Sequence, residues 1–292
     1  MSAERRIWRH YFPRFATMDL DRLRPGCEPF VQGPEDADRS IVLIHGLSDS
    51  PFFMRAMARE FAAMGYRVYA PLLEGHGLAA EHIGTMPAPA WPVWVDNVAF
   101  AIEEAGRAGR EVSIGGLSTG GTLAVYAAVQ EPTRIDGRVF LFAPALAIAG
   151  VADYLFRLPL VSSILGRFDR PGGFVQTEPW GHPYRYTRPA VDAVEQLEQL
   201  ILAIEGRVPR QPVWAVHSEA DQTAAYAATE RLVLQAAQGM LYRIGIAFQV
   251  PHASVLLDEP VLARNGSPLE PANPVFQPMM ASLRSFIIET QG

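Results

Sequence analysis

Ser118 is placed where a reactive serine would be expected. It is the central residue of the segment GLSTG at 116–120, which follows a short apolar run and precedes an alanine-rich one. A G-x-S-x-G motif between a strand and a helix is typical of a serine on a sharp turn, with its hydroxyl presented outward. Glycines on both sides let neighbouring backbone approach without a clash at Cβ. We therefore predict that Ser118 is a catalytic nucleophile.

Glycine-rich turns also bind phosphate groups, which is the rival use of this segment. However, no lysine follows the glycines, and neither G-x-G-x-x-G nor G-x-x-x-x-G-K-[ST] fits residues 113–122. The pattern therefore favours a nucleophile over a phosphate loop.

A serine hydroxyl needs a general base to accept its proton. Three histidines follow the motif in the chain, namely His182, His217 and His252. His252 lies in a loop after the last predicted strand and is the expected base. His217 ends an apolar segment, so we expect it to have a structural role.

The base in turn needs a carboxylate that orients its imidazole ring. Glu219 and Asp221 both follow the predicted strand at 213–216. Asp221 is the favoured candidate and Glu219 the alternative, although Asp221 also sits where a helix N-cap is expected. The order along the chain is then nucleophile, acid, base: Ser118, Asp221, His252.

Attack on a carbonyl group builds negative charge on its oxygen, and fixed N–H donors must stabilise that charge. The turn His45-Gly46-Leu47 ends the first strong apolar strand. We expect it to direct the Leu47 amide toward the same point as the Thr119 amide, and we expect His45 to support the turn.

Short apolar runs alternate with longer segments of helical periodicity, which predicts βαβ units around a mostly parallel central sheet flanked by helices. The predicted strands are 40–44, 67–70, 111–114, 138–142, 213–216 and 241–248. The clearest predicted helices are 52–63, 93–105, 119–130, 224–238 and 276–289.

One region interrupts this alternation and predicts an insertion. Residues 145–210 contain helical pieces, several prolines and an aromatic cluster, so we expect an inserted, mainly helical cap, with the α/β core formed by 1–144 and 211–292. A cap over the carboxyl edge of a parallel sheet would shape a ligand pocket. Its candidate lining residues are Phe156, Leu158, Leu160, Phe168, Phe174, Trp180 and Tyr184.

Taken together, these segments resemble the α/β-hydrolase superfamily, in the carboxylesterase and monoacylglycerol lipase branch that is grouped with serine aminopeptidase-type hydrolases. The matching segments are CEPFVQG, VLIHGLSDSP, YAPLLEGHG, WVDNV, GGLSTGG, HSEADQT and PHASVLLDE. The resemblance implies hydrolysis of small-molecule acyl esters through an acyl-serine intermediate without a cofactor. It also implies Leu47 and Thr119 as the oxyanion donors.

Two departures from the family pattern stand out. Ser218 occupies a position where relatives commonly have glycine, and residues 263–274 form a longer, proline-containing segment that we expect to be an irregular loop. The motif does not determine which bond is cleaved. A peptidase, thioesterase or lactonase with the same triad is therefore an alternative, and a non-catalytic ligand receptor is a more distant one.

Composition excludes several other classes of protein. The 292 residues carry a formal charge of −6, which gives no reason to expect nucleic-acid binding. A single cysteine, Cys27, excludes an internal disulfide and a cysteine-based zinc site, and suits a cytoplasmic location. No paired-histidine metal motif, secretion signal or membrane span is expected.

Overall fold

A seven-stranded sheet forms the centre of the computed structural model, which describes residues 8, 10–11, 15, 20–79, 89–108, 111–147, 182–186, 191–263 and 265–291. The strand order is β1-β3-β2-β4-β5-β6-β7; β1 pairs antiparallel with β3 and all other pairs are parallel. The strands are β1 (Phe30–Gln32), β2 (Arg39–Ile44), β3 (Tyr66–Ala70), β4 (Glu111–Leu117), β5 (Val139–Phe142), β6 (Val213–Ser218) and β7 (Gly239–Ile244).

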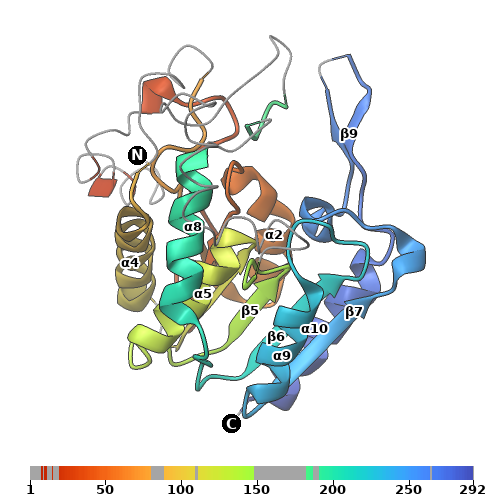
Figure 1. The fold of residues 1–292 in the computed structure, drawn as a ribbon. Coiled ribbons are helices and arrows are strands. Elements are labelled where there is room, and N and C mark those ends of the chain that lie inside the picture. Colours follow the sequence, from red (N-terminus) through yellow and green to blue (C-terminus); the bar gives the residue numbers. More distant parts are fainter. Residues whose placement is uncertain are drawn as a thin grey trace.

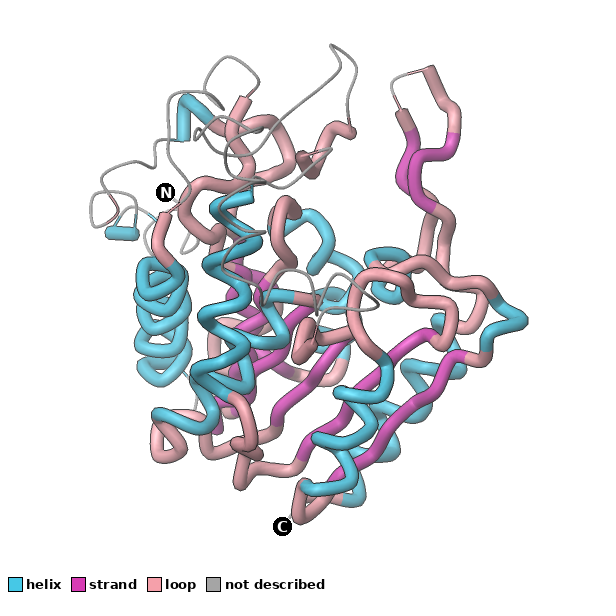
Figure 2. The backbone as a smooth tube through the Cα atoms, viewed as in Figure 1, coloured by secondary structure: helices cyan, strands magenta, loops and turns pink. Residues whose placement is uncertain are grey.

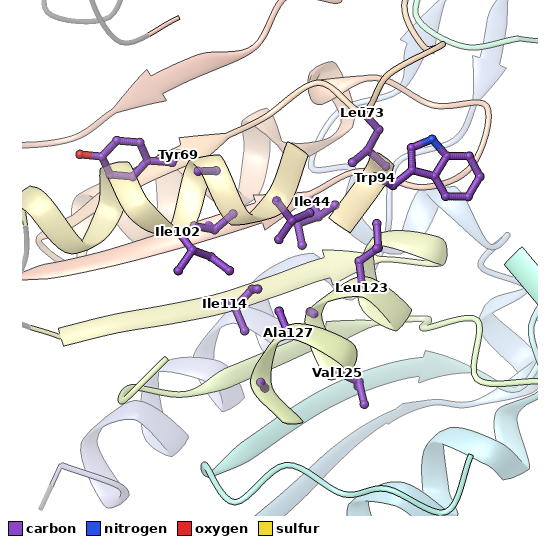
Figure 3. Close-up of a cluster of buried hydrophobic side chains, with 14 of the residues drawn as sticks. Ile44, Tyr69, Leu73, Trp94, Ile102, Ile114, Leu123, Val125 and Ala127 are labelled. Carbon is purple, nitrogen blue, oxygen red and sulfur yellow. The ribbon is translucent and has the colours of Figure 1, made fainter. Parts of the chain in front are cut away.

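The inner strands are apolar on both faces because helices cover both sides of the sheet. In β2, Val42 and Ile44 face one layer of the core, whereas Ile41 and Leu43 face the other. Figure 3 shows the first layer, where Ile44 and Ile114 lie close to Leu123 of a covering helix.

Two groups of helices build these layers. The helices α4 (Trp91–Ala108), α5 (Thr119–Gln130), α8 (Val191–Ile204) and α9 (Tyr226–Gln235) contribute to one core cluster, and α2 (Arg55–Ala63) and α10 (Phe276–Glu289) to the other. Figure 1 shows α4, α5 and α8 running side by side. The predicted α/β class, with a mostly parallel sheet between helices, is confirmed.

The ends of several elements differ from the predictions. The last sheet strand ends at Ile244 rather than 248, because Gly245 and the short 3-10 helix η3 (Ile246–Phe248) follow it. The side chains of Ile246 and Phe248 are 60% and 52% exposed, so these two residues do not continue the buried faces of the strand. The three-residue strand β1 was not predicted.

The segment 263–274 was also predicted incorrectly. It is not an irregular loop throughout, because β9 (Pro268–Glu270) pairs with β8 (Val261–Leu262), just before it in the chain, in a hairpin that projects from the molecule in Figures 1 and 2. Its turn contains Asn265-Gly266: Gly266 has φ +81°, and the Ser267 amide donates to Asn265 Oδ1. An Asn-Gly pair is the strongest short signal for a hairpin turn.

Most of the predicted cap falls outside the described residues, so its bounds at 145–210 stay a prediction. Six of its candidate lining residues also lie outside: Phe156, Leu158, Leu160, Phe168, Phe174 and Trp180. The seventh, Tyr184, stacks on Phe52 with ring centroids 3.5 Å apart. Within the described ranges, no helix combines the length and apolar character required to cross a membrane.

Candidate active site

Ser118 joins the central strand β4 to helix α5 through a sharp turn. Its backbone has φ 53° and ψ −120°, an unusual conformation for a residue other than glycine. Such strain persists only where the surrounding structure enforces it, and it is common at functional sites. The residue is 8% exposed. The GLSTG motif therefore has the strand–turn–helix context that a nucleophile elbow requires.

The neighbouring glycines allow three pieces of backbone to meet at this turn. A Cβ on Gly116 would lie 2.2 Å from the carbonyl carbon of Gly120. A Cβ on Gly120 would lie 2.1 Å from the carbonyl oxygen of Ile44, at the end of β2. Both contacts are shorter than any real side chain permits, so glycine is required at both positions. The result is that the turn after β2 lies directly against the elbow.

That turn brings the expected oxyanion donors to the serine. A Cβ on Gly46 would be 3.2 Å from the Ser118 Cβ, so the two residues are neighbours. In the part of the chain that the structure describes, neither the Leu47 amide nor the Thr119 amide donates to an acceptor. Ser48, with φ 63°, is a second strained residue in the same turn. Two unused N–H groups beside a serine can stabilise an oxyanion.

His45 supports this turn, as expected. Its Nε2 accepts a hydrogen bond of 3.0 Å from the Leu73 amide, so its Nδ1–H donates to the Gly46 carbonyl at 2.9 Å. The ring is fully buried, and burial, with a smaller effect of His76, holds the pKa of His45 well below its usual value. His45 is therefore neutral and holds the backbone around Gly46.

The structure brings His252 and Asp221 into direct contact. His252 Nδ1 donates to Asp221 Oδ2 at 2.5 Å. The other ring nitrogen, Nε2, is buried and has no hydrogen-bond partner among the described residues. An imidazole oriented by a carboxylate, with its second nitrogen unoccupied, has the arrangement of a general base before substrate binds.

Asp221 is held by several donors at once. Its Oδ1 accepts from the amides of Thr223 at 2.8 Å and Ala224 at 3.1 Å. It is not the helix cap that its position suggested, because α9 begins at Tyr226 and its N-cap is Ala225. Burial alone would raise the pKa of Asp221. Hydrogen bonds from His217 and His252 outweigh that effect, and the pKa lies well below its usual range. Asp221 is therefore ionised at neutral pH.

The alternative carboxylate, Glu219, is engaged elsewhere. Its Oε2 accepts a 2.9 Å hydrogen bond from the Ile246 amide, and its Oε1 lies 3.5 Å from the exposed Arg243 guanidinium. The structure thus brings Asp221, and not Glu219, to His252.

A buried carboxylate that the sequence did not indicate lies beside the serine. Asp49 is 2% exposed, and its Oδ2 is 2.5 Å from the position that a Cβ on Gly46 would occupy, on the side of Ser118. Burial raises the pKa of Asp49 above its usual value, although the charges of Arg185 and His252 oppose that shift. Asp49 therefore lies beside Gly46, which also adjoins Ser118, and its charge interacts with that of His252.

Arg185 neutralises this carboxylate. Its Nε is 3.1 Å from Asp49 Oδ1, and its Nη1 is 2.5 Å from Glu270 Oε1 at the end of β9. No local pattern in the sequence signals this network, because its members are far apart in the chain. Within the described ranges, no three side chains of His, Cys, Asp or Glu are grouped as a metal site requires.

Parts of the chain are similar in sequence to known proteins. Residues 35–169 match the family described as serine aminopeptidase, S33. A thermostable monoacylglycerol lipase of Bacillus sp. (strain H-257) is 34% identical over 107 residues, which are 37% of this chain and 41% of that protein. A carboxylesterase of Bacillus subtilis (strain 168) is 29% identical over 108 residues, 37% of this chain and 42% of that protein.

Similarity of fold extends over a larger part of the chain. A solved structure from work on the metagenome-derived lipolytic enzymes LipS and LipT superposes with a TM-score of 0.66 at 20% identity, covering 92% of this chain and 100% of that one. The chain has the α/β-hydrolase fold. The predicted resemblance to monoacylglycerol lipases and carboxylesterases is confirmed by the sequence matches. The sequence matches to the two Bacillus proteins span about two fifths of their length.

Sequence reasoning missed Asp49 and Arg185. It expected His217 to be a structural histidine, and the ring is indeed buried and hydrogen-bonded. What it did not foresee is that His217 lies 3.1 Å from the oxygen of Asp221 that binds His252. The sequence signal for this contact was the position of His217, four residues before Asp221 and near the end of a strand.

Proposed function

We propose that this α/β-hydrolase cleaves carboxylic esters of small molecules through an acyl-serine intermediate. In this proposal Ser118 is the nucleophile, His252 the general base, and Asp221 the carboxylate that orients it. The backbone amides of Leu47 and Thr119 form the oxyanion hole. The names of the two Bacillus relatives, a lipase and a carboxylesterase, support ester substrates.

The first half-reaction transfers the acyl group to the enzyme. His252 Nε2 takes the proton of the Ser118 hydroxyl as Oγ bonds to the ester carbonyl carbon. The carbonyl oxygen becomes an oxyanion between the two amides. When the intermediate collapses, the bond to the alkoxy oxygen breaks, and the Nε2 proton passes to that oxygen to release the alcohol.

The second half-reaction removes the acyl group with water. His252 Nε2 takes a proton from a water molecule whose oxygen attacks the acyl carbon. The same amides hold the new oxyanion. Collapse breaks the bond to Ser118 Oγ, which recovers its proton from Nε2, and the carboxylic acid leaves. Asp221 stays ionised throughout and stabilises the imidazolium form of His252.

One observation carries this proposal: the buried Nε2 of His252 has no partner, while its Nδ1 is held at 2.5 Å by Asp221. A buried polar atom without a partner is unusual in a stable protein. It is explained if that nitrogen is reserved for the Ser118 proton during turnover.

The test is Ser118→Ala, assayed with p-nitrophenyl butyrate. We expect kcat/KM to fall by about 10³-fold or more, because only the oxyanion donors and substrate binding remain. A fluorophosphonate probe should label the native chain and not the variant.

Ser267→Ala is the matched control, since Ser267 lies in the exposed turn of the β8–β9 hairpin. It should keep wild-type turnover and labelling. Near-normal ester hydrolysis by Ser118→Ala would refute the assignment. Labelling of Ser118 without multiple turnover would instead indicate a ligand receptor.

Peptide-bond cleavage is the second candidate, because the matching family is described as serine aminopeptidase. A substrate with a free amine would need an available carboxylate near Ser118. The carboxylate found there, Asp49, is paired with Arg185 at 3.1 Å, which favours esters. Comparing p-nitrophenyl esters with aminoacyl p-nitroanilides on the wild-type chain separates the two reactions.

A further inference from the structure

A second histidine lies directly behind the proposed catalytic carboxylate. His217, at the end of β6, has no exposed surface. Its Nε2 is 3.1 Å from Asp221 Oδ2, the same oxygen that accepts from His252. One carboxylate oxygen therefore contacts two imidazole rings, one on the side of the serine and one on the side of the core.

The contacts of His217 determine which of its nitrogens carries the proton. Nε2 faces two groups that only accept hydrogen bonds, Asp221 Oδ2 and, at 3.3 Å, the carbonyl oxygen of Ala224. Nε2 must therefore be protonated, and its hydrogen is shared between these acceptors. Nδ1 is then an acceptor, and its neighbour at 2.8 Å is the hydroxyl of Thr229.

Thr229 can supply that hydrogen from helix α9, where it is fully buried. The hydrogen bonds then run in one direction: Thr229 donates to His217, His217 to Asp221, and Asp221 accepts from His252. Every donor along this line meets an acceptor. Buried chains of this kind rigidify their members because an alternative arrangement leaves a polar group unpaired.

We propose that His217, held by Thr229 in the tautomer protonated at Nε2, is a positioning residue that fixes the Asp221 carboxylate for His252. This inference rests on the proposed function, in which Asp221 orients the base. His217 takes no proton from substrate and does not contact Ser118. It acts by supplying a neutral donor to Asp221, which leaves the charge of the carboxylate intact.

Among the described residues, the titratable and charged groups around this line can be named. Asp221 faces His217, His252 and backbone amides, and the Tyr226 ring of α9 lies 5.7 Å from the His217 ring. His252 also feels the charge of Asp49, which Arg185 balances. The variants below leave Asp49 and Arg185 in place. A change in the pH profile therefore reports on the donor supplied to Asp221.

The tautomer is tested directly by ¹⁵N NMR of histidine-labelled protein, without any turnover. We expect His217 to show a protonated Nε2 and an unprotonated Nδ1, with its signals assigned by their loss in His217→Gln. A His217 protonated at Nδ1, or at both nitrogens at neutral pH, would overturn the proposal.

The role is tested by comparing His217→Leu with His217→Gln, because only glutamine places an N–H donor near the former Nε2. For His217→Leu we expect kcat to fall about 10-fold with KM nearly unchanged, since one hydrogen bond to a charged group is lost. Without that donor the Asp221–His252 pair binds protons more tightly. The acidic limb of the kcat/KM profile should therefore move up by about 0.5 to 1 pH unit.

His217→Gln should recover most of the activity and the wild-type profile. Equal effects of the two variants, or a wild-type pH profile in His217→Leu, would contradict the inference.

Thr229 provides a second pair in case the leucine variant does not fold. Thr229→Ser keeps the hydroxyl and should match wild type. Thr229→Val is isosteric but removes the donor to Nδ1. Nε2 still faces two acceptors and keeps its proton, so the variant should change the ¹⁵N shift of Nδ1, which loses its hydrogen bond, and should lower kcat by about threefold because the ring is held less firmly. If Thr229→Val matches Thr229→Ser in both measurements, Thr229 does not hold the ring. Activity retained in Ser118→Ala would refute the proposed function instead, and the tautomer result would stand.

Discussion

At the scale of single residues, the site depends on backbone conformations that few side chains tolerate. Ser118 and Ser48 both have positive φ, and both lie in turns that bring amides toward the nucleophile. Gly116 and Gly120 permit these turns to touch. The surrounding sheet and helix supply the packing energy that holds this strain. The proposed chemistry therefore depends as much on the backbone as on the side chains of Ser118, Asp221 and His252.

A comparison of two variants shows whether Asp221 or Glu219 is the carboxylate that orients His252. Asp221→Asn should lower kcat/KM by about 10³- to 10⁴-fold, because the amide cannot stabilise the imidazolium and favours the wrong tautomer of His252. Glu219→Gln should change kcat/KM by no more than about threefold, because Glu219 contacts only the Ile246 amide and an exposed Arg243. Both are measured with p-nitrophenyl butyrate; a larger loss in Glu219→Gln would reverse the assignment.

At the scale of secondary-structure elements, Arg185 connects three segments that are far apart in the chain. Its guanidinium pairs with Asp49 in the turn after β2 and with Glu270 at the end of β9, and it lies over the Phe53 ring at 5.5 Å. The hairpin is thereby linked to the turn that presents the Leu47 amide. This gives the unexpected β8–β9 hairpin a connection to the site.

Removing Arg185 should be costly because it leaves a buried carboxylate unpaired. We expect Arg185→Met to lower the free energy of unfolding by about 3 to 5 kcal/mol in urea titrations. The double variant Arg185→Met/Asp49→Asn should recover much of that loss, since the charge that lacks a partner is gone.

The ion pair between Arg59 and Asp258 provides the matched control, because its side chains are 52% and 31% exposed. Arg59→Met should change stability by less than about 1 kcal/mol. Equal effects of the two arginine variants, or no recovery in the double variant, would show that the Asp49 pair contributes little.

At the scale of the whole molecule, the sequence predicted what depends on local pattern. The apolar runs located β2 to β6, and the GLSTG motif located the elbow, because buried parallel strands and tight turns leave signals within a few residues. Prediction from the sequence failed where a structural feature depends on contacts between distant segments or on the exposure of a side chain. The last strand was predicted to reach 248, although Ile246 is largely exposed. The contact between Asp49 and Arg185 joins segments that are far apart in the sequence and share no periodic pattern.

Buried neutral histidines should make the fold sensitive to acid. Burial lowers the pKa of His76 to about 4 and, with Arg185 and Arg24 nearby, that of His182 to about 3. The unfolded chain, with histidine near 6.5, binds more protons over this range, so stability is complete above about pH 6.5 and falls as the pH decreases. Each such histidine should remove about 1 to 2 kcal/mol between pH 7 and 5.

Urea titrations at both pH values test this with His182→Asn, which keeps an acceptor for the Tyr184 amide that now donates to Nδ1. The variant should lose less stability on acidification than wild type. His10→Asn, at an exposed position, should leave the pH dependence unchanged. An unchanged pH dependence in His182→Asn would show that folding does not lower the pKa of this ring.

The strand order has a consequence for how the site comes into being. The serine follows β4 in the middle of the sheet, whereas the imidazole is contributed only after β7, the last strand to join its edge. During synthesis, the turn that carries Ser118 is therefore made well before His252, the proposed base. Ester turnover would then serve as a reporter that synthesis has passed residue 252 and that the C-terminal strands have docked.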